Sequence, residues 1–305
     1  MRTFNPDNVL LMDAKDGNIP TQFAAAVVGE VVQNSAVMQL AQAEEMTAPK
    51  KEITYLAEGP GAYWVGEAER IQTSKATWLT AEMEAKKLGV IIPVSKEFLR
   101  YTVSDFFNMI RPKIAEAFYK KFDQAALFGT ATPYAAGQNI LAAATAASNT
   151  VAHIDSEPLY PQLNGLIGLV EDNEIDPDGI ATVRSLKQVF RGELDSTGRP
   201  IFVKGDGTAP DDILGLPIAY VNGSSFDKTK AVAMTGDWDY ARFGILQDIE
   251  YSISDQATLS TVVDEGGVPL NLWERDMFAL RATMHVGFMV LKDEAFAVLT
   301  PDVTP

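Results

Sequence analysis

Two stretches of alternating apolar and polar residues, separated by a long irregular connection, constrain the fold of this chain most strongly. Ile53, Tyr55 and Ala57 alternate with polar neighbours, and the alternation returns from Thr77 onward. This period of two predicts β-strands. The simplest interpretation is two long strands joined by residues 58–75, and a connection of that length is either functional or disordered. Because a two-stranded ribbon is only marginally stable in water, we expect it to lie against something else, such as a neighbouring subunit.

A long helix is the next clear prediction. Apolar residues recur with helical spacing over residues 102–128. Thr102 stands in a capping position, and Gly129 supplies a C-terminal stop signal. Pro112 lies inside the pattern and predicts a kink or a break after Ile110. At 1.5 Å per residue such a helix is about 40 Å long, which suits a structural spine.

The rest of the sequence mixes the two periodicities and predicts an α+β fold. A helical pattern extends from residue 20 to about residue 42, and residues 272–291 are mostly extended. Further helices are predicted at 160–174 and 186–194, and further strands at 179–183, 216–221, 231–235 and 251–254. Residues 295–299 form a short apolar end. We find no tandem repeat of solenoid type.

Composition excludes several classes of protein. A chain of 305 residues with 47% hydrophobic residues can bury a large core without covalent staples. The sequence has no cysteine, which excludes disulfides, thiolate metal sites and cysteine nucleophiles. His153 and His285 are far apart and make no metal-binding pair. The net charge of −16 disfavours nucleic acid and anionic lipid as partners unless charge is locally segregated.

Residues with catalytic or metal-binding potential are better explained as solvated turns and strand faces. Residues 205–208 are rich in Gly and Asp, but no EF-hand pattern follows. Glu67 with Glu69, or Glu82 with Glu84, would offer paired carboxylates, yet both pairs lie on predicted exposed strands where nothing raises a pKa. Nucleotide-binding glycine loops and the GxSxG elbow are absent. We therefore predict no catalytic site, no cofactor, no metal and no membrane-spanning segment.

Several ordered stretches carry a resemblance to a known family. They are YWVGEAERI at 63–71, KKLGVIIPVSKEFL at 86–99, FDQAALFG at 122–129, GDW at 236–238, FGI at 243–245 and LWERDMFALRAT at 272–283. In this order they resemble the major capsid protein of tailed bacteriophages, which has the Hong Kong 97-like fold. The resemblance covers about residues 20–300.

The resemblance implies a division of the chain. It comprises an N-terminal arm (1–25), a first part of the peripheral domain (26–49), an extended β-hairpin loop (50–92), the peripheral domain with its spine helix (93–149), a mixed α/β axial domain (150–245), returning peripheral strands (246–292) and a C-terminal return to the axial domain (293–305).

The resemblance also implies a structural protein rather than an enzyme. It would self-assemble into pentamers and hexamers of an icosahedral head that encloses double-stranded DNA, with assembly in the host cytoplasm. Two alternatives stay open: an encapsulin-type nanocompartment shell protein with the same fold and, more remotely, an acidic α/β hydrolase. The subunit-interface candidates are Tyr63, Trp64, Glu67, Arg70, Lys75, Trp78, Glu274, Arg275 and Arg281. Among them, Trp64 and Trp78 are expected to be exposed in a lone subunit, and Glu274 and Arg281 to pair within the peripheral domain.

Departures from some members of the family set further expectations. Some relatives carry a scaffolding segment ahead of the arm that a protease removes, whereas this sequence starts almost at the arm. Either a separate scaffolding protein assists or the sequence is the processed form; Met1 favours the separate scaffolding protein, and a portal and decoration proteins are expected as further partners. DNA contact is expected to be non-specific. Some relatives join subunits through a Lys–Asn isopeptide bond, but the late strand region here carries Asp276 and Thr283 where an Asn would be needed for Lys75. We expect no autocatalytic cross-link, so that boiled mature particles give intact monomer bands on a denaturing gel.

Overall fold

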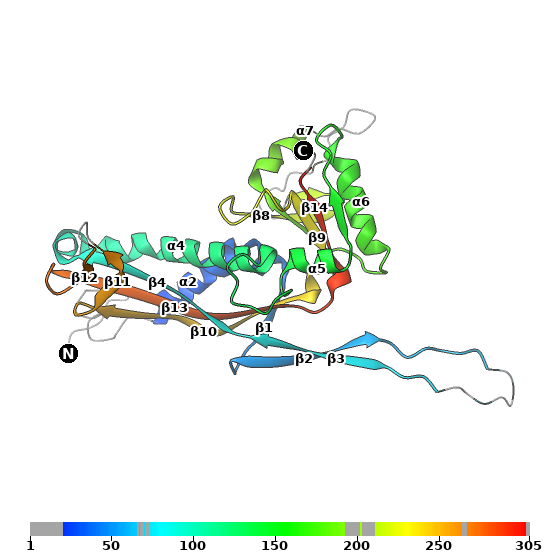
Figure 1. Ribbon diagram of the computed structural model, residues 1–305, viewed down its shortest axis with the longest axis horizontal. Helices are drawn as coiled ribbons and strands as arrows, with labels where there is room; N and C mark the ends of the chain where they lie inside the picture. The colour runs from blue at the N-terminus through cyan, green and yellow to red at the C-terminus, as the bar shows by residue number, and fades with distance from the viewer. Residues whose placement is uncertain are drawn as a thin grey trace.

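The computed structural model describes residues 21–302 apart from 66, 68, 69, 71, 72, 193–201, 203–210 and 264–266. The first 20 residues, most of the predicted arm, lie outside the described residues. An elongated body, a β-hairpin projecting from it and a second body rising from one side make up the fold (Figure 1). Helices and strands are both abundant, which confirms the α+β class.

The secondary structure can be given in chain order. The described helices are α2 (Thr21–Asn34), α3 (Ala36–Leu40), α4 (Lys96–Phe128), α5 (Ile140–Ala146), α6 (Leu159–Glu171) and α7 (Lys187–Gly192). The strands are β1 (Gln42–Glu45), β2 (Lys50–Glu58), β3 (Thr77–Glu84), β4 (Lys86–Ser95), β5 (Thr150–Ala152), β6 (Gly179–Val183), β7 (Asp212–Ile213), β8 (Leu216–Val221), β9 (Ala233–Gly236), β10 (Ala241–Ser254), β11 (Thr258–Val263), β12 (Pro269–Asn271), β13 (Met277–Val290) and β14 (Phe296–Thr300).

The elongated body is a four-stranded sheet covered by helices. Its strand order is β1-β10-β13-β4, and the long strands β10 and β13 run antiparallel along its length. Alternate residues of β13, including Met284 and Phe288, are fully buried and join one core with Ile114, Phe118 and Phe122 of α4. Helix α2 packs beside α4. The long amphipathic helix predicted from the sequence is therefore the element that covers this sheet.

Helix α4 differs from the prediction at its start and at its proline. It begins at Lys96, where the Ser95 hydroxyl oxygen accepts a hydrogen bond from the Glu97 amide at 3.2 Å, rather than at Thr102. It continues through Pro112, so of the predicted kink or break the break does not occur. Apolar side chains of the following turns are buried in the core, and the free energy gained by this burial offsets the cost of the hydrogen bond that proline removes. The predicted stop is confirmed, since Gly129 caps the helix with a φ of 62°.

The predicted helix over residues 20–42 is in fact two helices and a strand. Ser35 interrupts it because its hydroxyl oxygen accepts from the Met38 amide at 3.1 Å and caps α3. Residues 42–45 then pair in parallel with β10 as β1. The buried carboxylate of Asp123 on α4 accepts a hydrogen bond from the Ser35 hydroxyl and so holds the break between the two helices at this residue.

The second of the two long predicted strands is also divided. Strand β3 pairs with β2 and forms the hairpin, whereas β4 pairs with β13 in the four-stranded sheet. The change occurs at Ala85, whose amide donates to the Pro49 carbonyl at 2.8 Å. The hairpin strands therefore span residues 50–84, and residues 86–92 of the predicted 50–92 loop belong to the elongated body.

The second body is built on a six-stranded sheet with the order β5-β14-β9-β6-β8-β7. Strands β6 and β8 have the predicted bounds, and the apolar end of the chain is β14, paired with β5 and β9. Trp238 is fully buried between the two bodies, and its ring nitrogen donates to the Gly179 carbonyl at 3.1 Å. The two sheets therefore share one hydrophobic core.

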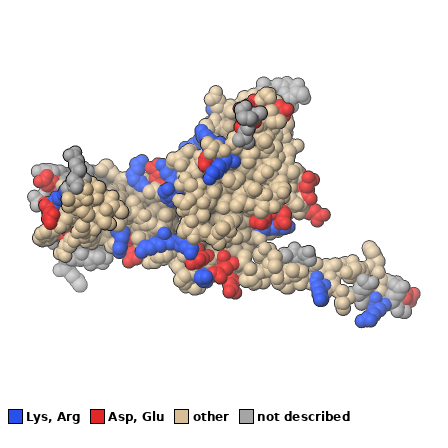
Figure 2. Space-filling view, in the orientation of Figure 1, with Lys and Arg blue, Asp and Glu red and all other residues tan. Residues whose placement is uncertain are grey.

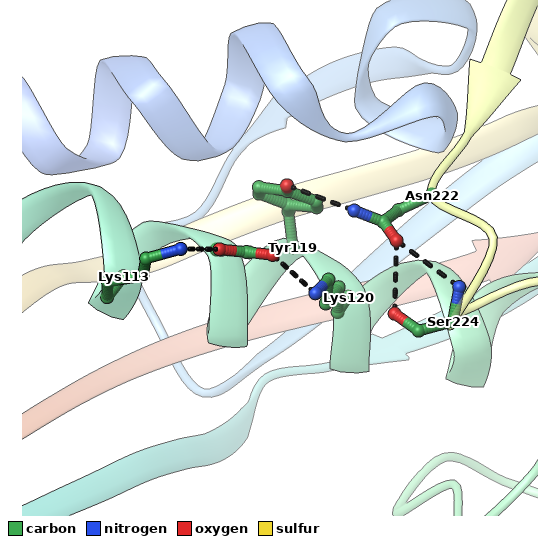
Figure 3. Close-up of polar contacts among 6 residues, drawn as sticks. Lys113, Tyr119, Lys120, Asn222 and Ser224 are labelled. Atoms are coloured by element: carbon green, nitrogen blue, oxygen red, sulfur yellow. Dashed lines mark hydrogen bonds and ion pairs between the residues drawn. The ribbon is translucent and has the colours of Figure 1, made fainter.

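Polar contacts also connect α4 to the second body. The Asn222 side-chain amide after β8 donates to the Tyr119 hydroxyl at 3.4 Å (Figure 3). The carbonyl oxygen of the same side chain accepts from the Ser224 amide at 3.2 Å and from its hydroxyl at 3.0 Å. A turn of the second body is thus held against the helix of the elongated body.

Candidate functional site

The root of the β2–β3 hairpin lies on a small methionine cluster formed by Met46, Met83 and Met289, all buried. The sheet beneath makes room for these side chains because Gly244 of β10 faces Gly287 of β13 across the strand pair. A Cβ on Gly244 would lie 2.6 Å from Met46 Cγ, and a Cβ on Gly287 would lie 2.9 Å from Met83 Cγ. The hairpin is therefore fixed at its root by close packing.

Charged groups add a second link at the root. Glu44 of β1 lies 2.7 Å from the Lys51 ammonium of β2 and 3.1 Å from the Arg242 guanidinium of β10. The hydrogen bond from Lys51 is the main cause that lowers the pKa of the Glu44 carboxyl. The same carboxylate thus connects the hairpin to the edge of the four-stranded sheet.

The distal half of the hairpin presents apolar side chains to solvent on both faces. Leu56 and Trp78 stand opposite each other on one face and are 44% and 64% exposed. On the other face Leu79 is 48% exposed and stands opposite Tyr55. Tyr55 packs against the edge of the methionine cluster, but Leu56 and Trp78 on the opposite face stay largely exposed, so that face lacks the packing partner that a two-stranded sheet needs. Figure 1 shows it extending away from both bodies.

The connection between β2 and β3 carries the predicted aromatic residues. Trp64 is fully exposed and Tyr63 is 52% exposed. The two sides of the connection are joined where the Gly61 amide donates to the Ser74 hydroxyl at 2.6 Å. Described residues of the connection form no helix or strand. The candidates Glu67, Arg70 and Lys75 are also exposed in this segment.

Strands β11 and β12 lie at the end of the elongated body away from the hairpin (Figure 1), and the other three candidates follow β12 in the turn before β13 or lie on β13 itself. Glu274 and Arg275 are exposed in the turn before β13. Arg281 is exposed on β13, and its Nε donates to the Ser252 hydroxyl at 2.9 Å on the neighbouring strand. No ion pair joins Glu274 to Arg281 within the described ranges. The candidates therefore form two separate surfaces rather than one.

Sequence reasoning missed several exposed apolar residues of these two surfaces. Trp273 is 66% exposed, and the Lys96 ammonium lies 5.8 Å from the centre of its ring. Val268, between β11 and β12, is 57% exposed, and Leu56 extends the hairpin surface. For Leu56 a signal existed: it shares its face of the strand with Glu52, Thr54 and Glu58, a polar pattern that predicts exposure to solvent. No comparable pattern distinguishes Trp273.

The paired carboxylates do not have the environment of a hydrolase site. Glu82 pairs with Lys50 on the hairpin. The Lys86 ammonium, 2.6 Å from Glu84, lowers the pKa of that carboxyl, whereas a general acid needs a raised pKa. Residues 205–208 lie outside the described residues. In the described ranges no group of three or more His, Cys, Asp or Glu side chains is arranged to hold a metal ion.

Even α4, the longest of the described helices, lacks the continuous apolar character needed to cross a bilayer, and no other described helix has it.

Comparisons with known proteins agree with this architecture. Residues 17–300 match the phage capsid family. The major capsid protein of Staphylococcus phage 80alpha is 42% identical over 302 residues, which cover 98% of this chain and 90% of that protein. A structure from Mycobacterium phage Cain has a TM-score of 0.74 at 28% identity, covering 90% of this chain and 92% of the other. A capsid from a native GTA particle, at 14% identity and a TM-score of 0.60 over 87% of this chain and 89% of the other, shares the fold. This chain belongs to the phage capsid family.

Proposed function

We propose that this chain is the major capsid protein of a tailed-phage head, which self-assembles into pentamers and hexamers of an icosahedral shell around double-stranded DNA. Membership of the phage capsid family supports this proposal. The single observation that supports it best is the β2–β3 hairpin. Its root is closely packed against the body, and its distal half exposes apolar side chains. A subunit of a shell can cover such a ribbon with a neighbouring copy.

The energetics of the ribbon favour assembly. Each large aromatic side chain removed from water contributes stability in proportion to its buried apolar area. Because the distal hairpin gains this burial only in contact with another chain, its folding is coupled to association by mass action. We infer that Tyr63, Trp64, Glu67, Arg70, Lys75 and Trp78 contact one neighbour and that Glu274, Arg275 and Arg281 contact another.

The domain roles follow from the same proposal. The four-stranded sheet with α4 serves as the peripheral domain, and the six-stranded body serves as the axial domain at the five-fold and six-fold axes. We propose that 1–25 is the N-terminal arm and that 293–305 returns to the axial domain. We propose that the chain acts structurally and not as an enzyme, and its membership of the phage capsid family supports this proposal.

The proposed partners are other copies of the chain, a separate scaffolding protein, a portal, decoration proteins and packaged DNA in non-specific contact, with assembly in the host cytoplasm. A phage head is favoured over an encapsulin because the relatives reported above are capsid proteins of phages and of a GTA particle. Purified particles are expected to protect double-stranded DNA from nuclease. Particles that instead contain a co-purifying cargo enzyme would favour the encapsulin.

Trp64→Ala is expected to reduce the yield of shells strongly while leaving the melting temperature of the unassembled subunit unchanged. The side chain is fully exposed in the subunit, so its removal costs no intramolecular packing. In an interface, by contrast, loss of a tryptophan typically costs about 2 kcal/mol or more per contact. Sedimentation and negative-stain microscopy measure the yield, and Trp64→Phe is the matched control that should restore most of it. Normal shell yield from Trp64→Ala would show that the residue is not in an interface.

A further inference from the structure

Five acidic residues follow one another closely at one end of the second body, between the last residue of α6 and the start of β6. Glu171 ends α6, and residues 172–178 carry four more acids. A carboxylate at the C-terminal end of a helix faces the negative pole of the helix dipole, which is unfavourable. The sequence has no lysine or arginine between Lys121 and Arg184. This end of the body therefore carries negative charge that its own segment does not neutralise.

A pocket with a volume of about 190 Å³ opens among these acids. Glu171 and Asp176 line it, and neither pairs with a lysine or arginine in the described part of the chain. The other lining residues are Asn164, Ile167, Pro177, Leu214 and Leu216. An arginine side chain matches such a pocket, because its apolar stem can lie on the walls while its guanidinium meets the carboxylates. We call it the acidic pocket.

Three cations lie beyond the other end of β6. Arg184 directly follows this strand, and the Lys228 ammonium donates to the Ser185 hydroxyl at 3.1 Å, which places both cations at this end. Burial raises the pKa of Tyr220 on β8, whereas Arg184 and Arg191 act in the opposite direction, so both guanidinium groups lie near its hydroxyl. Arg184, Arg191 and Lys228 are exposed, and none of them has a carboxylate partner among the described residues. We call these three residues the cationic flank.

The acidic pocket and the cationic flank lie on opposite sides of the second body. The five residues of β6, Gly179–Val183, separate Asp176 from Arg184, which is about 17 Å along an extended strand. Strand β8 runs parallel to β6, so Leu216 at its start lies at the same end as Asp176. Figure 2 shows Lys and Arg side chains on the flank of the second body toward β8 and acidic side chains on the flank beside α6. The two surfaces are therefore too far apart to pair within one chain.

We propose that the cationic flank of one copy docks on the acidic pocket of the next copy, with Arg184 between Glu171 and Asp176. This inference rests on the proposed function and assigns the contact that joins the second bodies within a ring of subunits. Charge complementarity selects a second copy as the partner, because the same chain presents both the unpaired cations and the unpaired acids. Since the two surfaces differ and face opposite ways, the contact is head to tail, and its repetition closes a ring.

The pocket distinguishes this contact from an ordinary surface ion pair. Exposed pairs contribute little, because water and salt screen them. In the acidic pocket the apolar walls, including Ile167 and Leu216, exclude water from the guanidinium, and two carboxylates can accept its N–H groups. Removal of either partner leaves a charge unpaired in every contact of the ring. Ring formation should therefore be sensitive to these residues.

Charge reversal and exchange test the pairing in the full chain. Glu171→Lys with Asp176→Lys reverses the acidic pocket, and Arg184→Glu with Lys228→Glu reverses the cationic flank. Each pair of substitutions should lower the yield of rings and shells by roughly tenfold or more. All four substitutions together exchange the two charges and should restore most of the yield. Sedimentation and negative-stain microscopy, with the assembly partners present, measure the yield.

The unassembled subunit supplies an independent readout. Glu171→Lys places a cation at the C-terminal end of α6, so the melting temperature should stay unchanged or rise slightly. Asp155→Lys with Glu157→Lys is the matched control, because it makes the same change of charge at exposed positions before α6 and should leave the yield of shells normal. Equal losses of yield in the pocket variant and the control would overturn the inference. So would folded subunits whose yield the four substitutions fail to restore.

Cross-linking separates this inference from the proposed function. The sequence has no cysteine, so Pro177→Cys with Ser185→Cys supplies the only thiols, one beside each surface, and removes no charged partner. A short bismaleimide applied to assembled shells should give a ladder on a denaturing gel that ends at five and six subunits. Shells without a ladder would refute the docking and leave the capsid function intact. Failure of the wild-type chain to form shells with its assembly partners would refute the capsid function.

Discussion

Gly236→Ala is expected to destabilise the unassembled subunit by about 3 kcal/mol. Gly236 ends β9, where that strand pairs with β14 in the six-stranded sheet. An added Cβ would lie 2.4 Å from the Ala295 carbonyl oxygen and 2.5 Å from a ring carbon of Phe296. Both groups are buried, and one of them is backbone, so relief requires the two strands to separate. Chemical denaturation of the unassembled subunit measures the loss as a lower midpoint.

Gly165→Ala is the matched control for this prediction. Gly165 is exposed in α6, and an added Cβ would meet no atom within 4 Å. Replacing a helical glycine with alanine stabilises a helix by roughly 0.5–1 kcal/mol. The two substitutions add the same methyl group and are expected to shift the midpoint in opposite directions. Equal shifts in the same direction would contradict the packing of β9 against β14.

The pH dependence of stability is expected to depend strongly on Asp123. This residue of α4 is fully buried, and its carboxylate accepts from the Ser35 hydroxyl at 2.5 Å and from the Ala36 and Val37 amides at 3.2 and 3.4 Å. Burial outweighs these hydrogen bonds and raises the pKa of Asp123 from 3.8 to about 7. The folded state therefore holds a proton over a pH range in which the unfolded state has lost it.

The sign of the effect follows from proton binding. Stability contributed by protonated Asp123 is fully present below about pH 4 and is lost as the pH rises to about 7. Between about pH 5 and pH 8 the free energy of unfolding should fall by on the order of 3 kcal/mol because of this group. The lowered pKa of Glu116, at about 2, acts outside this range. Denaturation midpoints measured across the range should therefore decline toward alkaline pH.

Asp123→Asn isolates this contribution. The amide keeps the size of the carboxyl but cannot ionise, so most of the decline should disappear. Asp123→Ala leaves the Ser35 hydroxyl and the α3 amides without their partner and should cost about 3 kcal/mol at acidic pH. An unchanged pH profile in Asp123→Asn would mean that the wild-type group does not titrate in this range.

Elements set by local pattern could be predicted from the sequence. Strands β6 and β8 are bounded by the apolar runs themselves, and Gly129 ends α4 because only a residue tolerant of positive φ continues the turn there. Features set by distant contacts could not be predicted. The break between α2 and α3 at Ser35 depends on Asp123, 88 residues away. The separation of β3 from β4 at Ala85 depends on the pairing of β4 with β13.

The candidate surfaces show the same limit. Trp64 and Trp78 were identified because aromatic residues in an irregular connection and on a ribbon have no intrachain partner. Trp273 could not be identified, because no sequence pattern distinguishes it from the buried aromatic residues of the same chain.

Assembly is the property that tests the central claim most directly. Sedimentation and negative-stain microscopy are to be carried out on the chain expressed alone and together with its neighbouring genes. Closed shells, or rings of five and six subunits, are the predicted result, because the exposed hairpin is stabilised only by a neighbouring copy. A chain that stays monomeric even with its scaffolding and portal partners would contradict the account.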